Sequence, residues 1–352
     1  MACLVAGCLL AAGGASAQRM EGDLARAQGT YEAEVQVYSQ RDAERRAGFG
    51  RGLAQVLGKM SGDRSVAERP GVAQEMRRAE NYVEHYDYRQ DEGVSASGAP
   101  TFHTILVVRY DGEAVDAMAA ALGLPVWPEP RPRPVLWLAI DDGRGPRLVT
   151  VNQNNAVRPV LDRARQRGYG LGLPRGSAAE QAATGAIWRG DHGAVARLSA
   201  RYAPPMQLLG KLYRHEGGWR ADWTFVDNGR VLSQWSSEDA NVRVAMASGA
   251  DGAADALVKR YAKAAETGPA GSYRFTFTGI DSSDDFIRLA GALQGMSVVQ
   301  GITPLRATPE GLEVELDLLT GMPGFRSLAD ENVLVEVETL LDTGTPIYRL
   351  VR

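Results

Sequence analysis

The chain has 352 residues, of which 44% are hydrophobic and 23% charged, with a formal net charge of -4 at pH 7. This length allows two or three domains with cores of their own, and the composition excludes a disordered chain. The negative net charge and the lack of a Lys/Arg-rich run argue against a nucleic-acid or anionic-lipid partner.

The first residues resemble an export signal. Residues 2–17 carry no charge and end in Ala15-Ser16-Ala17, the small-x-small pattern of a signal-peptidase site. We therefore predict a signal peptide at 1–17, a mature N-terminus at Gln18 and a periplasmic product.

The sequence also allows a second localisation, because Val5-Ala6-Gly7-Cys8 resembles a bacterial lipobox. A lipid on Cys8 would make the protein an outer-membrane lipoprotein. Cys3 and Cys8 are the only cysteines, so we expect a mature chain without disulfides, thiolate metal sites or a Cys nucleophile. Beyond residue 17, no apolar run approaches the roughly 18 residues of a membrane span.

The next residues, 18–130, are predicted to form an N-terminal α+β domain. Alternating apolar residues indicate a strand at 30–39, and helical spacing indicates helices from Asp42 and over 66–80. Two strand-like runs at 82–90 and 101–111 are interpreted as a hairpin, followed by a short helix at 114–122.

The proline-rich segment 127–134 marks a predicted domain boundary. The run Pro134 to Asp142 is apolar at successive positions, as in a strand buried on both faces of an α/β sheet. We expect a central α/β domain at 131–268 that also contains an antiparallel meander. Its other predicted elements are a helix near 155–167, a short strand at 170–173, two helical stretches ending near Tyr202, meander strands at 207–213, 219–225 and 230–235, and a helix at 252–265.

The last section, 269–352, repeats strands and helices on a smaller scale. Its predicted order, βαββαβ, is that of a ferredoxin-like module. The predicted elements are strands at 273–279, 297–305, 312–319, 333–340 and 347–351, and helices at 283–293 and 323–330.

Several blocks together resemble an uncharacterised proteobacterial exported family, domain of unknown function 2066 (DUF2066). They are YEAEVQV, GLAQVLGKMSGD, PVLWLAIDDG, ARYAPPMQLLGKL and GGWRADWTF, and they span roughly residues 30–265. The middle domain also resembles, at the level of fold, the curli-secretion and penicillin-binding-protein-activator lipoproteins of the envelope. Ala200, Tyr202, Leu209 and Gly210 fit that pattern, whereas Pro204-Pro205 and Gln207 depart from it. Neither resemblance brings catalytic residues.

Asp141 and Asp142 follow the predicted central strand, where α/β sheets bind ligands. Two carboxylates there are suited to a cation or to acid/base chemistry. The alternative is that they are turn residues before Gly143 that accept hydrogen bonds from nearby amides. The glycines of 143–147 lack the spacing of a phosphate loop.

The remaining polar motifs point to structural roles. The histidines, His85, His103, His192 and His215, form no metal-ligand spacing, although the first two lie in the hairpin strands and could face each other. The segment 281–285 lacks the glycine and glutamate of a calcium loop and is interpreted as a helix cap. We expect no cofactor and no metal.

Three tryptophans of the meander, Trp219, Trp223 and Trp235, have two interpretations. Large aromatics on one strand face usually belong to the core. The alternative is an exposed platform that binds a glycan or a peptide.

Export, the lack of a catalytic motif and several sheet edges favour a cell-envelope binding or scaffolding protein without catalytic activity. Its partner would be an envelope protein or one associated with peptidoglycan. The alternative is an envelope enzyme that uses Asp141 and Asp142.

Overall fold

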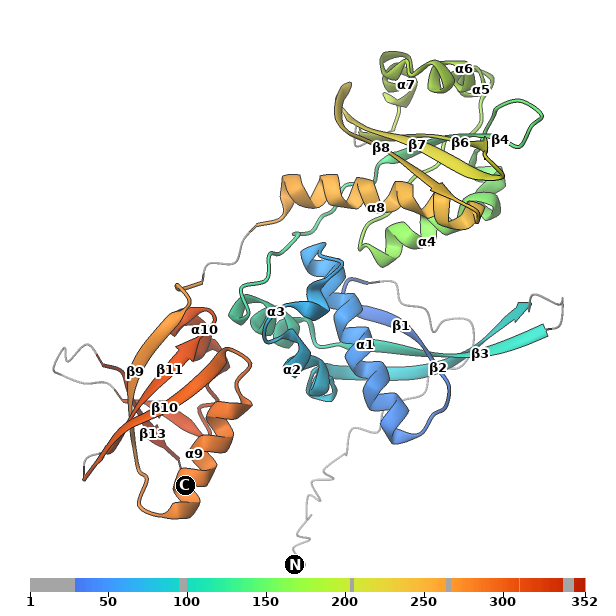
Figure 1. Cartoon of the computed structure of the whole chain (residues 1–352). Coiled ribbons are helices and arrows are strands. Elements are labelled where there is room, and N and C mark those ends of the chain that lie inside the picture. The colour runs from blue at the N-terminus through green and yellow to red at the C-terminus, as the bar shows by residue number, and fades with distance from the viewer. Residues whose placement is uncertain are drawn as a thin grey trace, which may run out of the picture.

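The computed structural model describes residues 29–94, 100–202, 206–263, 267–309, 311–337 and 345–351. Three β-sheets with helices packed on them make up this part of the chain (Figure 1). The predicted mixture of α/β and α+β structure is confirmed. The predicted signal peptide, with Cys3 and Cys8, lies outside the described residues. Within the described ranges, no helix is long and apolar enough to cross a membrane.

The N-terminal unit is an antiparallel sheet in the order β1-β3-β2, with α1 packed on one face. Phe49, Leu53 and Leu57 of α1 are almost completely buried. The predicted hairpin and short third helix are confirmed. The elements are β1 (Glu32–Val37), α1 (Asp42–Ser61), the 3-10 helix η1 (Val66–Glu68), α2 (Val72–Arg77), the 3-10 helix η2 (Ala79–Tyr82), β2 (Val83–Val94), β3 (Pro100–Tyr110) and α3 (Gly112–Ala121).

The single helix expected over 66–80 is wrong, because this segment is broken into short pieces. Gly71 between η1 and α2 has φ +81°, a left-handed conformation that ends a regular helix and suits glycine. A Cβ there would lie 2.5 Å from Leu122 and 2.9 Å from the Ser297 carbonyl oxygen. The break therefore lets the chain pass close to neighbouring elements.

The central unit is a mixed sheet in the order β5-β4-β6-β7-β8. β4 and β6 are parallel, and β6, β7 and β8 form the predicted antiparallel meander. The elements are β4 (Val135–Asp141), β5 (Arg147–Leu148), the 3-10 helix η3 (Val151–Val157), α4 (Arg158–Gln166), α5 (Ala178–Gln181), α6 (Ala183–Arg189), α7 (His192–Ser199), β6 (Met206–His215), β7 (Gly218–Asp227), β8 (Arg230–Asp239) and α8 (Val242–Tyr261).

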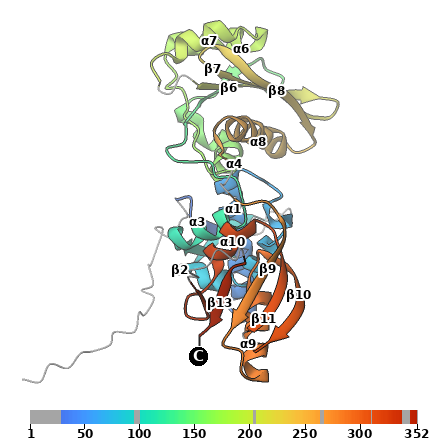
Figure 2. The same ribbon diagram turned by 90° about the vertical axis from the view of Figure 1, so that its left-hand side faces the viewer.

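This sheet is the middle of three layers (Figure 2). α4 and α8 cover one face, and α6 and α7 cover part of the other. Strand β4 contributes Leu136 and Leu138 to the first core and Trp137 and Ala139 to the second, all fully buried. The prediction of a strand buried on both faces is confirmed.

Two expectations in the central unit are wrong. The segment 170–173 makes an isolated bridge from Gly172 to Val135 and no strand. Helix α8 begins at Val242, ten residues before the predicted start at Gly252. Asn241 caps it by accepting a hydrogen bond from the Arg243 amide at 2.9 Å.

The C-terminal unit has the sheet order β10-β11-β9-β13-β12. The predicted succession of strands and helices is confirmed, and the chain closes with a β12–β13 hairpin whose second strand runs parallel to β9. The elements are β9 (Gly271–Thr278), α9 (Ser283–Gly295), β10 (Val299–Thr308), β11 (Gly311–Leu318), α10 (Gly321–Leu328), β12 (Leu334–Glu336) and β13 (Ile347–Leu350).

The units are packed on one another. The N-terminal and C-terminal cores form one continuous apolar cluster, and Thr320 before α10 donates a 2.5 Å hydrogen bond to the Ala121 carbonyl of α3. Arg167 joins the central unit to the N-terminal unit. Its guanidinium donates hydrogen bonds to Asp251 and Asp255 of α8 and to the Gly62 carbonyl after α1. The domain boundaries at 130 and 268 stay predictions.

Candidate functional site

Asp141 is the last residue of β4, and Asp142 begins the turn after it. Asp141 Oδ1 accepts hydrogen bonds from the amides of Gly143 at 2.9 Å and Gly145 at 3.0 Å. Asp142 Oδ2 lies 2.7 Å from the Arg147 guanidinium. Both carboxylates thus have local partners that stabilise the turn, as the structural interpretation expects. Their role in chemistry stays a prediction.

The other polar motifs occupy separate places. His85 lies opposite Arg109 and His103 opposite Asp91, so the idea that the two histidines face each other is wrong. Ser282 accepts a hydrogen bond from the Asp285 amide, which confirms the helix cap. Among the described residues, no three His, Cys, Asp or Glu side chains form a group that could hold a metal ion.

The three tryptophans differ in exposure. Trp223 is 1% exposed and donates from Nε1 to Ser248 Oγ at 3.0 Å, within the core beneath α8. Trp235 is half-buried and donates to the Ser248 carbonyl at 3.1 Å. Trp219 is half-buried, with the Arg214 guanidinium 4.1 Å from its ring centre. Only Trp219 and Trp235 therefore have surface to offer a ligand.

Two glycines of α8 allow these indoles to lie against the helix. A Cβ on Gly249 would come within 2.5 Å of Trp223, and one on Gly252 within 2.2 Å of Trp235. Their spacing of three residues places both on one helix face. The glycines that weaken α8 as an isolated helix thus bring it close to the meander.

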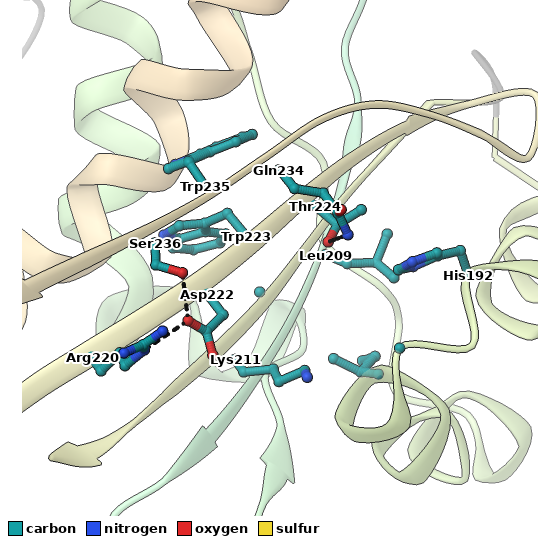
Figure 3. Close-up of a pocket in the computed structure, with 13 residues that line it drawn as sticks. His192, Leu209, Lys211, Arg220, Asp222, Trp223, Thr224, Gln234, Trp235 and Ser236 are labelled. Carbon is teal, nitrogen blue, oxygen red and sulfur yellow. Dashed lines mark hydrogen bonds and ion pairs between the residues drawn. The ribbon is translucent and has the colours of Figure 1, made fainter.

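The opposite face of the meander is polar and partly open. It lines a hollow of about 460 Å³ between the sheet and the α6–α7 turn. Figure 3 shows Lys211, Asp222 and Ser236 on this side, with Trp223 and Trp235 turned away. Asp222 accepts hydrogen bonds from Ser236 Oγ at 2.7 Å, from the Arg220 guanidinium at 3.0 Å and from Tyr213.

Among the described residues that line the hollow, Lys211 is the one cation without a counter-ion. Lys211 is half-buried, lies opposite Asp222 in the β6–β7 register and extends away from it (Figure 3). Within the described ranges, neither a hydrogen bond nor an ion pair engages its ammonium group. The carboxylate of Asp222 is held by its three donors and so belongs to the sheet's own network.

The edge strands of the three sheets differ in how open they are to pairing with another chain. An edge strand exposes main-chain donors and acceptors that another strand can pair with. The edge of β1 is closed by α1. Arg51, Gln55 and Lys59, one helical turn apart, donate side-chain hydrogen bonds to the carbonyls of Gln36, Glu34 and Glu32 at 3.3, 3.1 and 2.5 Å. These alternate carbonyls are the acceptors on one edge of the strand.

The edge strands β2, β10, β5 and β12 have features that hinder pairing with another strand. β2 carries several charged side chains, and β10 contains Pro304 beside two register shifts. β5 has two residues and β12 has three. Charge, proline, bulges and short length all discourage pairing with another strand.

In the described structure, β8 has one bulge, which leaves Leu232 unpaired with β7, and between its two ends it has neither a charge nor a proline. It is 10 residues long, its segment Val231–Ser237 carries no charge, and none of its residues is buried. Val231 and Leu232 are 44% and 37% exposed. In the part of the chain that the structure describes, β7 is its sole ladder partner. The structure thus presents one long, uncharged edge.

A groove of about 850 Å³ lies between this edge and α8. We call it the β8–α8 groove. Its strand side is Leu232 to Ser237, and its helix side is formed by Ser248, Asp251, Gly252, Asp255, Ala256, Lys259 and Arg260. Ser233 Oγ has no hydrogen-bond partner among the described residues. An edge strand beside a helix is the arrangement in which strand-adding domains hold extended peptides.

Sequence reasoning does not find the β8–α8 groove: of the residues that it selects, Asp141, Asp142, Trp219, Trp223 and Trp235, the last alone lines it. The uncharged run Val231–Ser237 was the available signal. Its meaning depends on β8 lying at an edge, which is set by contacts with distant segments.

Comparison with known protein families gives a match to part of the chain. A family model for a domain of unknown function, DUF8605, matches residues 25–128, the region from β1 to α3. This is a different domain from DUF2066, so the predicted membership of the DUF2066 family is wrong. Neither the curated proteins nor the solved structures contain a match.

Proposed function

We propose that this protein is a non-catalytic binding or scaffolding protein of the cell envelope, and that it captures an extended segment of a partner along β8. The observation that carries this proposal is the contrast between edges. The β1 edge is capped by three side chains of α1, whereas β8 is long, uncharged and bordered by a groove. Main-chain pairing would give affinity, and the groove would select side chains.

The envelope location rests on residues 1–17 and is part of the proposal. An exported chain without cysteines after Cys8 relies on packing and ion pairs for its stability. A sheet that ends, within the described residues, in a long edge strand with an uncharged middle suits such a chain to holding another protein.

The first test is a pull-down from envelope extract with matched surface variants. Leu232→Lys puts a charge on the β8 edge, whereas Val244→Lys puts the same charge on an exposed position of α8. We expect the wild type and Val244→Lys to retain the same partner and Leu232→Lys to lose it. Retention by Leu232→Lys would contradict the proposal.

The second test asks whether main-chain hydrogen bonds hold the partner. The captured segment is mapped by crosslinking and synthesised in two forms, N-methylated at odd or at even residues. Only alternate amides of an added strand face β8. We expect one form to lose binding and the other to retain it, whereas equal binding of both would exclude strand addition.

A further inference from the structure

The charges around the β8–α8 groove indicate which extended segment fits it. Both acidic residues of the groove already have partners. Asp251 lies 3.1 Å from Arg167, and Asp255 lies 2.6 Å from the same guanidinium and 3.2 Å from Arg64. These carboxylates are neutralised by the protein itself.

The cations are distributed differently. Arg260 is paired with Asp227 at 3.0 Å, at the β7–β8 turn. Lys259, the residue before it, is exposed and lines the groove, and Arg230 is exposed at the first position of β8. Within the described residues, neither Lys259 nor Arg230 takes part in an ion pair or a side-chain hydrogen bond. Lys259 therefore gives the turn end of the groove an uncompensated positive charge, and Arg230, which lies outside the lining, adds a second one at the start of β8.

The other end of β8 is acidic. Glu238 lies 2.8 Å from Arg220, and Asp239 accepts a 2.7 Å hydrogen bond from the Asn241 amide. The strand therefore starts with a cation, ends with two carboxylates and is uncharged between them. A bound segment is matched when its own acidic residues lie beside Arg230 and Lys259.

We infer that the β8–α8 groove binds an extended peptide segment whose C-terminal end is acidic, paired antiparallel with β8. This inference rests on the proposed function. Antiparallel pairing continues the order of β6, β7 and β8 and is the more stable pairing per residue. That direction places the segment's C-terminal residues beside the start of β8.

The net charge of the whole protein opposes the binding of an acidic peptide. A chain with a net charge of -4 repels an acidic peptide at long range. Preference for acidic residues must therefore come from the local cations of the groove.

The test uses fluorescent ten-residue peptides in which Thr and Val alternate, with blocked ends and a final pair of Glu, Gln or Lys residues. We expect the Glu peptide to bind the full mature chain roughly 10-fold more tightly than the Lys peptide, and less so at high salt. Replacing both cations, with Arg230→Gln and Lys259→Gln, should abolish this difference. Lys211→Gln removes one positive charge from the opposite face of the sheet and should leave the difference in affinity between the two peptides unchanged.

The outcomes separate the two proposals. Equal binding of the Glu and Lys peptides, or an unchanged preference in the double variant, would overturn the acidic specificity and leave strand capture standing. Failure of all three peptides to bind would overturn strand capture and the specificity with it. Loss of preference in Lys211→Gln would assign the acidic segment to the hollow of Figure 3 instead.

Discussion

Replacing Trp223 tests the packing that holds β7 against α8. The indole is 1% exposed, and burying such a ring removes about 200 Å² from water. At about 25 cal/mol per Å², this area corresponds to ~5 kcal/mol, part of which an alanine methyl retains. Trp223→Ala should therefore lower the free energy of unfolding by roughly 3 to 5 kcal/mol.

The residues around Trp223 indicate a loss of unfolding free energy near the upper end of that range. Gly249 and Gly210 face the ring, so no side chain from either position can move into the cavity. Ser248 Oγ keeps its 2.7 Å hydrogen bond to the Ala245 carbonyl, so little further cost arises from an unsatisfied hydroxyl.

Urea denaturation followed by far-UV circular dichroism measures this effect. Typical slopes of about 1–3 kcal/mol per molar urea predict a midpoint lowered by about 1 M or more. Trp235→Ala, which removes a ring that is only half-buried, should lower the free energy of unfolding clearly less than Trp223→Ala does. A Trp223→Ala protein within about 0.5 kcal/mol of the wild type would refute the core assignment.

Three further predictions concern other parts of the chain. Burial lowers the pKa of Lys59 from 10.5 to about 8. Between these values the unfolded state binds a proton that the folded state does not, so the free energy of unfolding should rise with pH from about 8 to 10. Lys59→Met should flatten this rise when unfolding is measured across that pH range, and an unchanged rise would contradict the assignment to Lys59. Asp141→Asn with Asp142→Asn should lower the melting temperature slightly, because the turn loses charged hydrogen-bond acceptors, without loss of any turnover. A lost activity at unchanged melting temperature would support the enzyme alternative. Intact mass should show Gln18 as the first residue, and a diacylglyceryl adduct on Cys8 would show a lipoprotein.

Local patterns predicted much of the fold. The apolar run of β4 requires burial on both faces, and Asn228-Gly229 with alternating strands on either side specifies the β7–β8 hairpin. Both features depend on neighbouring residues alone. They were therefore readable without knowledge of the tertiary structure.

The errors arose where distant contacts decide the local structure. The start of α8 contains glycines that discourage helix, and the helix forms there because Gly249 and Gly252 accommodate the indoles of β7 and β8. Gly71 separates η1 from α2 where the chain meets Leu122. Neither contact is visible in sequence spacing.

The candidate site depends even more on tertiary structure. The caps on β1 come from α1 side chains that lie 15, 21 and 27 residues from the carbonyls they bind. The availability of β8 is a property of the whole sheet order. A sequence can show an uncharged strand, but it does not show which strand is left at the edge.

Amide hydrogen exchange along β8 tests the central claim most directly. In the free protein, alternate amides from Ser233 to Ser237, beyond the bulge at Leu232, should exchange fast, because only every second one donates to β7. Adding the captured segment should slow those fast amides and leave the exchange of β1 unchanged. Unchanged exchange along β8 in a saturated complex would contradict strand capture and place the binding surface elsewhere.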